Sequence, residues 1–266
     1  DANLADFDIT NAKSFALRSR DITGADGSLF KYGIGAIDSA VQDGQNILNV
    51  RRLNQIGSWD SSTNTFTRKR LRKSAPYLSA DDLAIIGHAM WLLNWHERHQ
   101  RCPQSGETTV MADGGYKRVN PSSGVEQYPR INPVAIVLPT FGEKVCLGRG
   151  PDFPPGFLSA FAGYLEPGET LEECAIRELH EEAGLNATDA EYIFSQPWPF
   201  SASLMVGFIA PVESLELTLD PEEIAEARWC SREEIRDALQ GHHDHGFFVP
   251  PPYTIAHQLL KVWVAR

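Results

Sequence analysis

The chain has no excess of positive charge, no long apolar run and few cysteines. Its 266 residues include 24 Lys and Arg against 35 Asp and Glu, which gives a formal net charge of −11. This balance argues against general electrostatic binding to nucleic acid or to an anionic membrane. No apolar run approaches the roughly 20 residues of a transmembrane helix, so we expect no membrane partner.

The few cysteines indicate a reducing compartment. They stand at positions 102, 146, 174 and 230 without paired spacing, which is not the pattern of a disulfide framework. The first residues, DANLADFDIT, carry neither the basic nor the apolar stretch of a signal peptide. We therefore expect a cytoplasmic protein.

Apolar periodicity predicts strands alternating with helices. The hydrophobic content of 42% is enough for one large or two small cores. We expect strands at 31–37, 47–53, 134–138, 144–149, 191–196, 203–211 and 227–230, and helices at 80–101, 171–183, 232–240 and 254–264. This order suits an α/β (α+β) fold with a mixed sheet between helices.

The segment from Gly163 to Leu185 carries the strongest local signals. Thr170 and Glu173 have the spacing of a capping box, which predicts the start of a helix. Gly184 stands where helices commonly end in the left-handed conformation. The sequence therefore predicts a short helix between these residues.

Glu178, Glu181 and Glu182 lie on one side of that expected helix. Like charges at this spacing repel, and anions are disfavoured near a helix C-terminus. A solvated acidic face is one interpretation. The other is a site for Mg²⁺ or Mn²⁺, because such cations take carboxylate oxygens and share substrate phosphates.

The spacing favours the metal site. Gly163, Glu169, Arg177 to Leu179, Glu181-Glu182 and Gly184-Leu185 resemble the Nudix box at each of its fixed positions. The resemblance implies a hydrolase that splits the diphosphate of a nucleoside diphosphate linked to another group. It also implies the Nudix α/β/α sandwich.

A second motif, SQPWPFSAS at 195–203, begins ten positions after the box. Box and motif together resemble the NADH pyrophosphatase (NudC-like) subfamily, although Ser201 stands where that subfamily often has proline. Prolines restrict the backbone and aromatic rings stack on flat heterocycles, whereas the alternative is a proline-bounded strand with core aromatics. The resemblance implies substrate contacts by Tyr128, Gln196, Pro197, Trp198, Pro199, Phe200, Ser201, Ala202, Ser203 and Ala256.

The resemblance also implies the catalytic and metal-binding residues. The expected catalytic set is Glu178, Glu181, Glu182 and Glu223. The same four carboxylates and the backbone carbonyl of Ala162 are the expected ligands of two or three Mg²⁺ or Mn²⁺ ions. Glu223 would act as ligand or as base, with Glu222 and Glu226 as alternatives.

Three regions are expected along the chain. They are an N-terminal mixed α/β domain at 1–100, a linker resembling a zinc ribbon at 101–127, and the catalytic Nudix domain at 128–266. The polar loop with His242, His243 and His245 either binds a metal or is a mobile loop, and flanking glycines favour the loop.

The ribbon-like linker lacks its metal donors. Cys102 begins the first Cys-x-x-Cys pattern, but Ser105 takes the second position and Asn120 and Ser123 take the other two. One thiolate and three neutral side chains cannot hold tetrahedral zinc tightly. We predict no structural zinc, with hydrogen bonds and packing in its place.

The expected reaction is metal-dependent hydrolysis of NADH or NAD⁺ to (reduced) nicotinamide mononucleotide and AMP. The resemblance also allows removal of NAD caps from RNA 5′ ends, and it implies a homodimer. Two alternatives stay open: a Nudix hydrolase of ADP-ribose or another dinucleotide, and a catalytically silent NAD(H)-binding protein.

Overall fold

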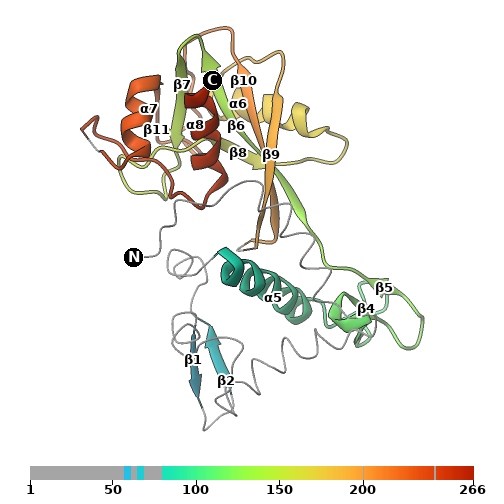
Figure 1. The fold of residues 1–266 in the computed structure, drawn as a ribbon. Helices are drawn as coiled ribbons and strands as arrows, with labels where there is room; N and C mark the ends of the chain where they lie inside the picture. Colours follow the sequence, from blue (N-terminus) through green and yellow to red (C-terminus); the bar gives the residue numbers. More distant parts are fainter. Residues whose placement is uncertain (1–56, 61–64, 69–79, 200, 243) are drawn as a thin grey trace. The chain divides into compact units, whose positions relative to one another are not determined.

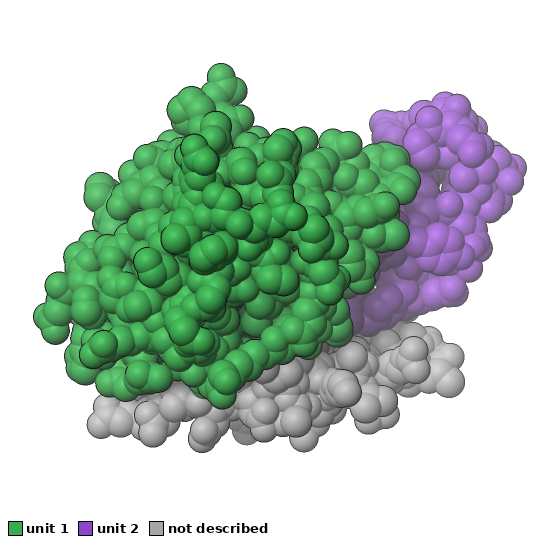
Figure 2. All heavy atoms as spheres, turned by 90° about the horizontal axis from the view of Figure 1, so that it is seen from above, with its two compact units in different colours: residues 1–5, 132–198, 203–266 green, residues 6–131, 199–202 purple. Residues whose placement is uncertain are grey.

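The computed structural model describes residues 57–60, 65–68, 80–199, 201–242 and 244–266. The strands expected at 31–37 and 47–53, together with Phe200 and His243, lie outside these residues. The chain divides into two compact units, drawn in green and purple in Figure 2. Unit 1 comprises 1–5, 132–198 and 203–266, and unit 2 comprises 6–131 and 199–202.

Unit 1 contains a six-stranded mixed sheet and three helices, α6, α7 and α8 (Figure 1). The strands are β6 (Asn132–Phe141), β7 (Lys144–Arg149), β8 (Phe161–Tyr164), β9 (Glu191–Trp198), β10 (Ser203–Pro211) and β11 (Glu226–Ser231). The helices are α6 (Leu171–Ala183), α7 (Arg232–Leu239) and α8 (Ile255–Ala265). The sheet order is β11-β7-β6-β10-β9, and β8 also pairs with β6. Strand β10 runs parallel to β6, whereas the other pairs are antiparallel.

The sheet has a separate hydrophobic core on each face. Side chains alternate along a strand, so Ala135 and Val137 of β6 enter one core while Ile136 and Leu138 enter the other. The first core contains the apolar face of α6, including Leu179, and the second contains residues of α7 and α8. This arrangement is the α/β/α sandwich that the resemblance implied.

The predicted elements of unit 1 agree closely with those observed. The strands expected at 144–149 and 203–211 have the same bounds as β7 and β10, and β9 runs two residues further than expected. Residues 134–138 of β6 are all apolar and buried, which explains why the sequence shows a continuous apolar run there.

Unit 2 contains α5 (Ala80–Arg98), the hairpin β1 (Gly57–Asp60) and β2 (Thr65–Arg68), and a small sheet. That sheet consists of β3 (Val110–Ala112), β4 (Lys117–Val119) and β5 (Glu126–Gln127), with a 3₁₀ turn at Asp113–Gly115. The expected helix at 80–101 ends three residues earlier, at Arg98. No helix among the residues described is long and apolar enough to cross a membrane.

A buried arginine joins α5 to the small sheet. Arg118 of β4 donates from Nε to Thr109 Oγ1 and from Nη2 to Thr109 O, both at 2.7 Å. Its Nη1 lies 3.1 Å from Nδ1 of buried His96, whose Nε2 lies 2.9 Å from Gly115 O. Since arginine only donates, His96 accepts at Nδ1 and donates from Nε2. Burial lowers the pKa of His96, which suits this neutral form.

Candidate metal-binding and catalytic site

The box helix α6 has the two ends that its sequence predicts. Thr170 accepts a hydrogen bond from Glu173 N, and the Glu173 carboxylate accepts one from Thr170 N, which completes the capping box. At the other end Gly184 is left-handed, with φ 68°, and its N–H donates to His180 O and Leu179 O. Local chemistry thus fixes where the helix begins and ends, and therefore which way its side chains face.

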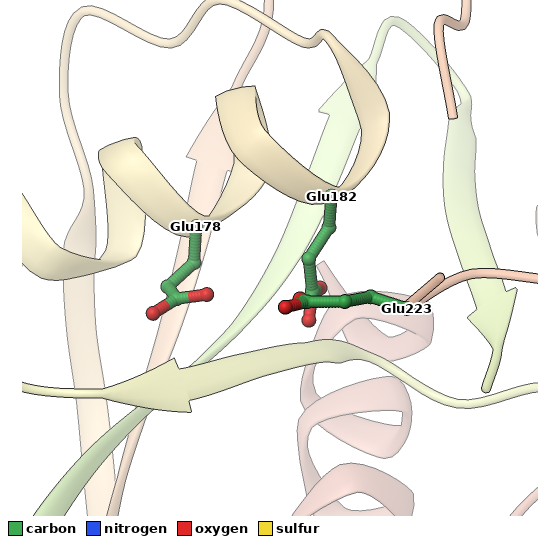
Figure 3. Close-up of side chains that lie close together, drawn as sticks. All are labelled: Glu178, Glu182 and Glu223. Carbon is green, nitrogen blue, oxygen red and sulfur yellow. The ribbon is translucent and has the colours of Figure 1, made fainter. Parts of the chain in front are cut away.

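Three carboxylates meet beside α6, as Figure 3 shows for Glu178, Glu182 and Glu223. One oxygen from each lies within 4.8 Å of the others, which is close enough for one cation to bind all three. Glu181 is outside this group and half exposed, and its Oε2 accepts from Arg177 Nη1 at 2.8 Å. The structure therefore brings together three of the four predicted carboxylates.

Glu223 reaches the group because its loop is anchored to the end of α6. Thr218 N donates to Ala183 O at 2.9 Å, and Asp220 N donates to Glu182 O at 3.1 Å. Glu223 N then donates to Asp220 O in a turn. These bonds satisfy carbonyls that a helix end leaves free, and they bring a carboxylate 41 positions beyond Glu182 back to it.

The two alternatives to Glu223 point elsewhere. Glu226 pairs with Arg149 at 3.2 Å across β11 and β7. Glu222 is exposed, and its backbone N–H donates to Asp220 Oδ1. Ile224, next to Glu223, is buried in the core on the α6 side, which orients Glu223 away from that core.

Gly163 leaves the space that the Glu178 carboxylate occupies. A Cβ at this position would lie 1.8 Å from Glu178 Cδ and 1.9 Å from its Oε1. Any side chain would displace that carboxylate, which explains the glycine that opens the box. The backbone of Ala162, the preceding residue of β8, favours the ionised form of Glu182 and so acts to lower its pKa.

Burial of like charges shifts the pKa values of this cluster upward. Glu178 and Glu182 are each only 7% exposed. Burial, followed by the charges of Glu178 and Glu223, raises the pKa of Glu182 to about 8. Glu182 Oε2 is buried and has no hydrogen-bond partner within the described part of the chain. A buried carboxylate oxygen without a partner is costly, and a divalent cation would satisfy it.

Arg177 organises the side of the cluster that faces the loop before α6. Its guanidinium donates to Glu169 Oε1 at 2.5 Å, to Glu178 Oε1 at 2.7 Å and to Tyr164 O at 3.0 Å. Arg177 thus forms an ion pair with Glu169 in that loop. This pairing lowers the pKa of Glu169 to about 2. Burial still raises the pKa of Glu178 despite its contact with Arg177.

Residues 195–198 of the SQPWPF motif form the end of β9, and Gln196 anchors the start of α8. Its Nε2 donates to Tyr253 O at 3.0 Å, and its Oε1 accepts from Ile255 N at 2.8 Å. Both functional groups of the amide are therefore used within unit 1. A direct contact between Gln196 and substrate would compete with these bonds, so the structure supports a positioning role.

The other predicted substrate residues have different surroundings. Ser203 and Ala256 are buried, at 1% and 3% exposure, and Ala256 belongs to the core on the side of α7 and α8. Pro197 is exposed and Trp198 half-buried in β9, while Pro199, Ser201 and Ala202 belong to unit 2. Tyr128, also in unit 2, is 59% exposed, and its hydroxyl donates to Glu126. The expected contacts with substrate remain predictions.

The polar loop with three histidines contains a local anchor. His245 Nε2 lies 3.0 Å from Asp237 Oδ2 of α7, and its carbonyl accepts from Arg228 Nη1 at 3.2 Å. His245 thus fastens its part of the loop to α7 and β11, and the choice between a metal site and a mobile loop stays a prediction.

Fold and site together define a class: the chain belongs to the Nudix family. The sequence profile of the NUDIX domain matches residues 129–250, and that of the NADH pyrophosphatase zinc ribbon domain matches residues 97–128. The subfamily resemblance noted from the SQPWPF motif is confirmed.

Three relatives show how the likeness is distributed. The human "NAD-capped RNA hydrolase NUDT12" is 42% identical over 197 residues, which cover 70% of this chain and 43% of that protein. The human mitochondrial "NAD(P)H pyrophosphatase NUDT13" is 39% identical over 207 residues, covering 74% and 59%. The "NAD-capped RNA hydrolase NudC" of Stutzerimonas stutzeri is 37% identical over 196 residues, covering 74% and 67%. The chain thus spans about half the length of the first of these relatives and two thirds of the last.

The raised pKa of Glu182 predicts an unusual pH dependence of stability. Between the ordinary pKa of 4.5 and the folded-state pKa of about 8, the folded protein holds a proton that the unfolded chain releases. This group therefore makes the free energy of unfolding fall as pH rises through that window, by about 1 kcal/mol per pH unit. We expect Glu182→Gln to remove this decline, so that the variant gains stability over the wild type at pH 8.5 but not at pH 4.5.

Urea denaturation at pH 4.5, 6.5 and 8.5, in chelator and without divalent cations, measures this difference. Glu172→Gln, on the exposed first turn of α6, is the matched control. A difference between Glu182→Gln and the wild type that does not change with pH would contradict the burial argument.

The anchoring role of Gln196 predicts a loss of stability from an isosteric change. Gln196→Glu keeps the acceptor for Ile255 N but replaces the donor to Tyr253 O with a carboxylate oxygen. A buried hydrogen bond lost in this way costs about 1–3 kcal/mol. We expect a decrease of that size in chemical denaturation at pH 7, and none for Gln100→Glu at an exposed position. Equal stabilities of the two variants would show that Gln196 does not anchor α8.

Proposed function

We propose that this chain is a metal-dependent hydrolase of the diphosphate in NADH and NAD⁺. The observation that carries the proposal is the cluster of the buried Glu178 and Glu182 with the exposed Glu223, in which one carboxylate oxygen of Glu182 lacks a partner among the described residues. The names of the relatives, which are NAD-capped RNA hydrolases and an NAD(P)H pyrophosphatase, support the substrate class.

The donor set suits Mg²⁺ or Mn²⁺. Three carboxylates and a nearby backbone carbonyl are hard oxygen ligands, which these cations prefer. Glu178, Glu182 and Glu223 would hold the metal, with Ala162 contributing its carbonyl and Glu181 assisting from the helix surface. Bound there, the metal supplies Lewis-acid neutralisation of the charge on the diphosphate oxygens.

The remaining chemistry belongs to the side chains and a water molecule. Water attacks one phosphorus of the diphosphate, the bridging P–O bond breaks, and the products are nicotinamide mononucleotide (reduced, from NADH) and AMP. We assign acceptance of the water's proton to Glu223, which is the exposed member of the cluster. Arg177 positions Glu178, since its guanidinium donates to that carboxylate.

Removal of NAD caps from RNA is the finer form of the same proposal. Two relatives are named NAD-capped RNA hydrolases, which supports this activity, and the bond that breaks is the same P–O bond of the diphosphate. Assembly as a homodimer and a cytoplasmic location are also proposed. The four cysteines are free and buried, which accords with a reducing compartment.

The decisive assay is an incubation with NADH, NAD⁺, ADP-ribose and NAD-capped RNA, each with Mg²⁺ or Mn²⁺, with products separated by chromatography. We expect (reduced) nicotinamide mononucleotide and AMP from the dinucleotides, and complete inhibition by chelator. Cleavage of ADP-ribose alone would agree with Nudix chemistry but would reject NADH and NAD⁺ as the substrates. Binding of NADH without any cleavage would contradict the proposed hydrolase activity.

Substitution of Glu178 tests the cluster itself. Glu178→Gln removes a negative ligand without changing size, and we expect kcat to fall by at least about 100-fold with little change in the melting temperature. Glu172→Gln on the same helix should retain full activity. Activity of Glu178→Gln within a few-fold of the wild type would contradict the metal assignment.

A further inference from the structure

Two turns in unit 2 share one pattern of hydrogen bonds. In the first, Cys102 N donates to Glu107 O and Gly106 N donates to Cys102 O, both at 2.8 Å. In the second, Asn120 N donates to Val125 O at 2.9 Å and Gly124 N donates to Asn120 O at 2.8 Å. Both turns close on a left-handed glycine, with φ 73° at Gly106 and 72° at Gly124. The chain thus keeps the paired turns that hold the metal in a zinc ribbon.

The donors at the four ligand positions do not fit zinc. Structural zinc takes four thiolate or imidazole ligands, whereas this chain offers the Cys102 sulfur, two hydroxyls and the Asn120 amide. Cys102 is buried. The backbone of Ser105 and Gln104, followed by the side chains of Ser105 and Asn120, lowers the pKa of Cys102 to about 7. The sulfur therefore lies among polar groups of the two turns.

The side chain of Asn120 joins the two turns. It is fully buried, and its Nδ2 donates to Ser105 Oγ at 3.0 Å and to Glu107 Oε2 at 2.8 Å in the first turn. Its Oδ1 accepts from Ser122 N at 2.9 Å in its own turn, with Ser123 N further away at 3.4 Å. The donor side of the amide thus faces one turn and the acceptor side faces the other.

Glu107 gives this link a charged acceptor. Its Oε2 accepts from Asn120 Nδ2 and from Ser105 Oγ, the latter at 3.0 Å. These bonds lower the pKa of Glu107, so the carboxylate is ionised at neutral pH. Hydrogen bonds to an ionised acceptor are stronger than neutral ones.

We propose that the amide of Asn120, bonded to Glu107 and Ser105, holds the two turns together in place of a zinc ion. The ribbon is then a metal-free variant that keeps the shape of the family's zinc ribbon. This role is independent of the proposed hydrolase activity, because it concerns the folding of unit 2 alone.

An isosteric substitution separates this proposal from a zinc site. Asn120→Asp removes the donor and places a second carboxylate beside that of Glu107, but it adds an accepted zinc ligand. We expect it to lower the melting temperature by about 3–8 °C and to speed hydrogen exchange in residues 101–127. Gln104→Glu, which adds the same charge at an exposed neighbouring position, should change neither.

Zinc content is measured on the same full-length proteins by elemental analysis. We expect less than about 0.1 zinc per wild-type chain, and a melting temperature in metal-free buffer that chelator leaves unchanged. The combined variant Ser105→Cys, Asn120→Cys and Ser123→Cys should bind about one zinc per chain, because the two turns still face each other.

Two results would overturn the proposal. One is about one zinc per wild-type chain, retained in Asn120→Asp and needed for the native melting temperature. The other is a zinc-free protein in which Asn120→Asp and Gln104→Glu have the same melting temperature and hydrogen exchange, which would remove the structural role of Asn120.

Discussion

Two buried carboxylates one helical turn apart, Glu178 and Glu182, impose the constraint that the rest of unit 1 satisfies. Burial and mutual repulsion both disfavour their charged forms. Arg177 relieves Glu178 through one hydrogen bond, but Glu182 keeps an oxygen without a partner among the described residues. Without a cation, a proton on Glu182 removes the unfavourable buried charge, which is why the pKa of Glu182 is raised. Under the proposed function, a cation would compete with this proton for the Glu182 carboxylate.

The two hydrophobic cores keep these carboxylates in place. Leu179, between them in sequence, is fully buried in the core on the α6 side, so α6 cannot rotate to carry its acidic side into solvent. Gly163 lets β8 approach so closely that the Glu178 carboxylate fills the space of an absent Cβ. The loop bonded to the end of α6 then brings Glu223 to the same point. The apolar packing thus holds like charges together against their repulsion.

Sequence reasoning succeeded where the signals are local. The ends of α6, the strands β7 and β10, and the placement of Glu178 and Glu182 on one side of α6 all follow from spacing within one element or one motif. It was less informative where the partner is distant in sequence. The expected contact between Gln196 and substrate stays a prediction, but the bonds of its amide to the backbone at 253 and 255 are ones that no periodicity could indicate. Glu181 shares the spacing of its neighbours, but only packing shows that it faces solvent.

The family relationship suggests two metal sites, and these differ in whether their buried polar atoms already have hydrogen-bond partners. At the carboxylate cluster, one buried oxygen lacks a partner, and hard oxygen ligands converge on one point. At the ribbon, both ends of the buried Asn120 amide are bonded, its Nδ2 to Ser105 and Glu107 and its Oδ1 to Ser122 N. A polar group that already has its hydrogen bonds gains little from an ion, whereas one without them gains much. The same physical criterion therefore supports the proposed cation at the carboxylate cluster and the proposed amide link at the ribbon, and the two proposals together predict that removal of metal stops catalysis without unfolding the ribbon.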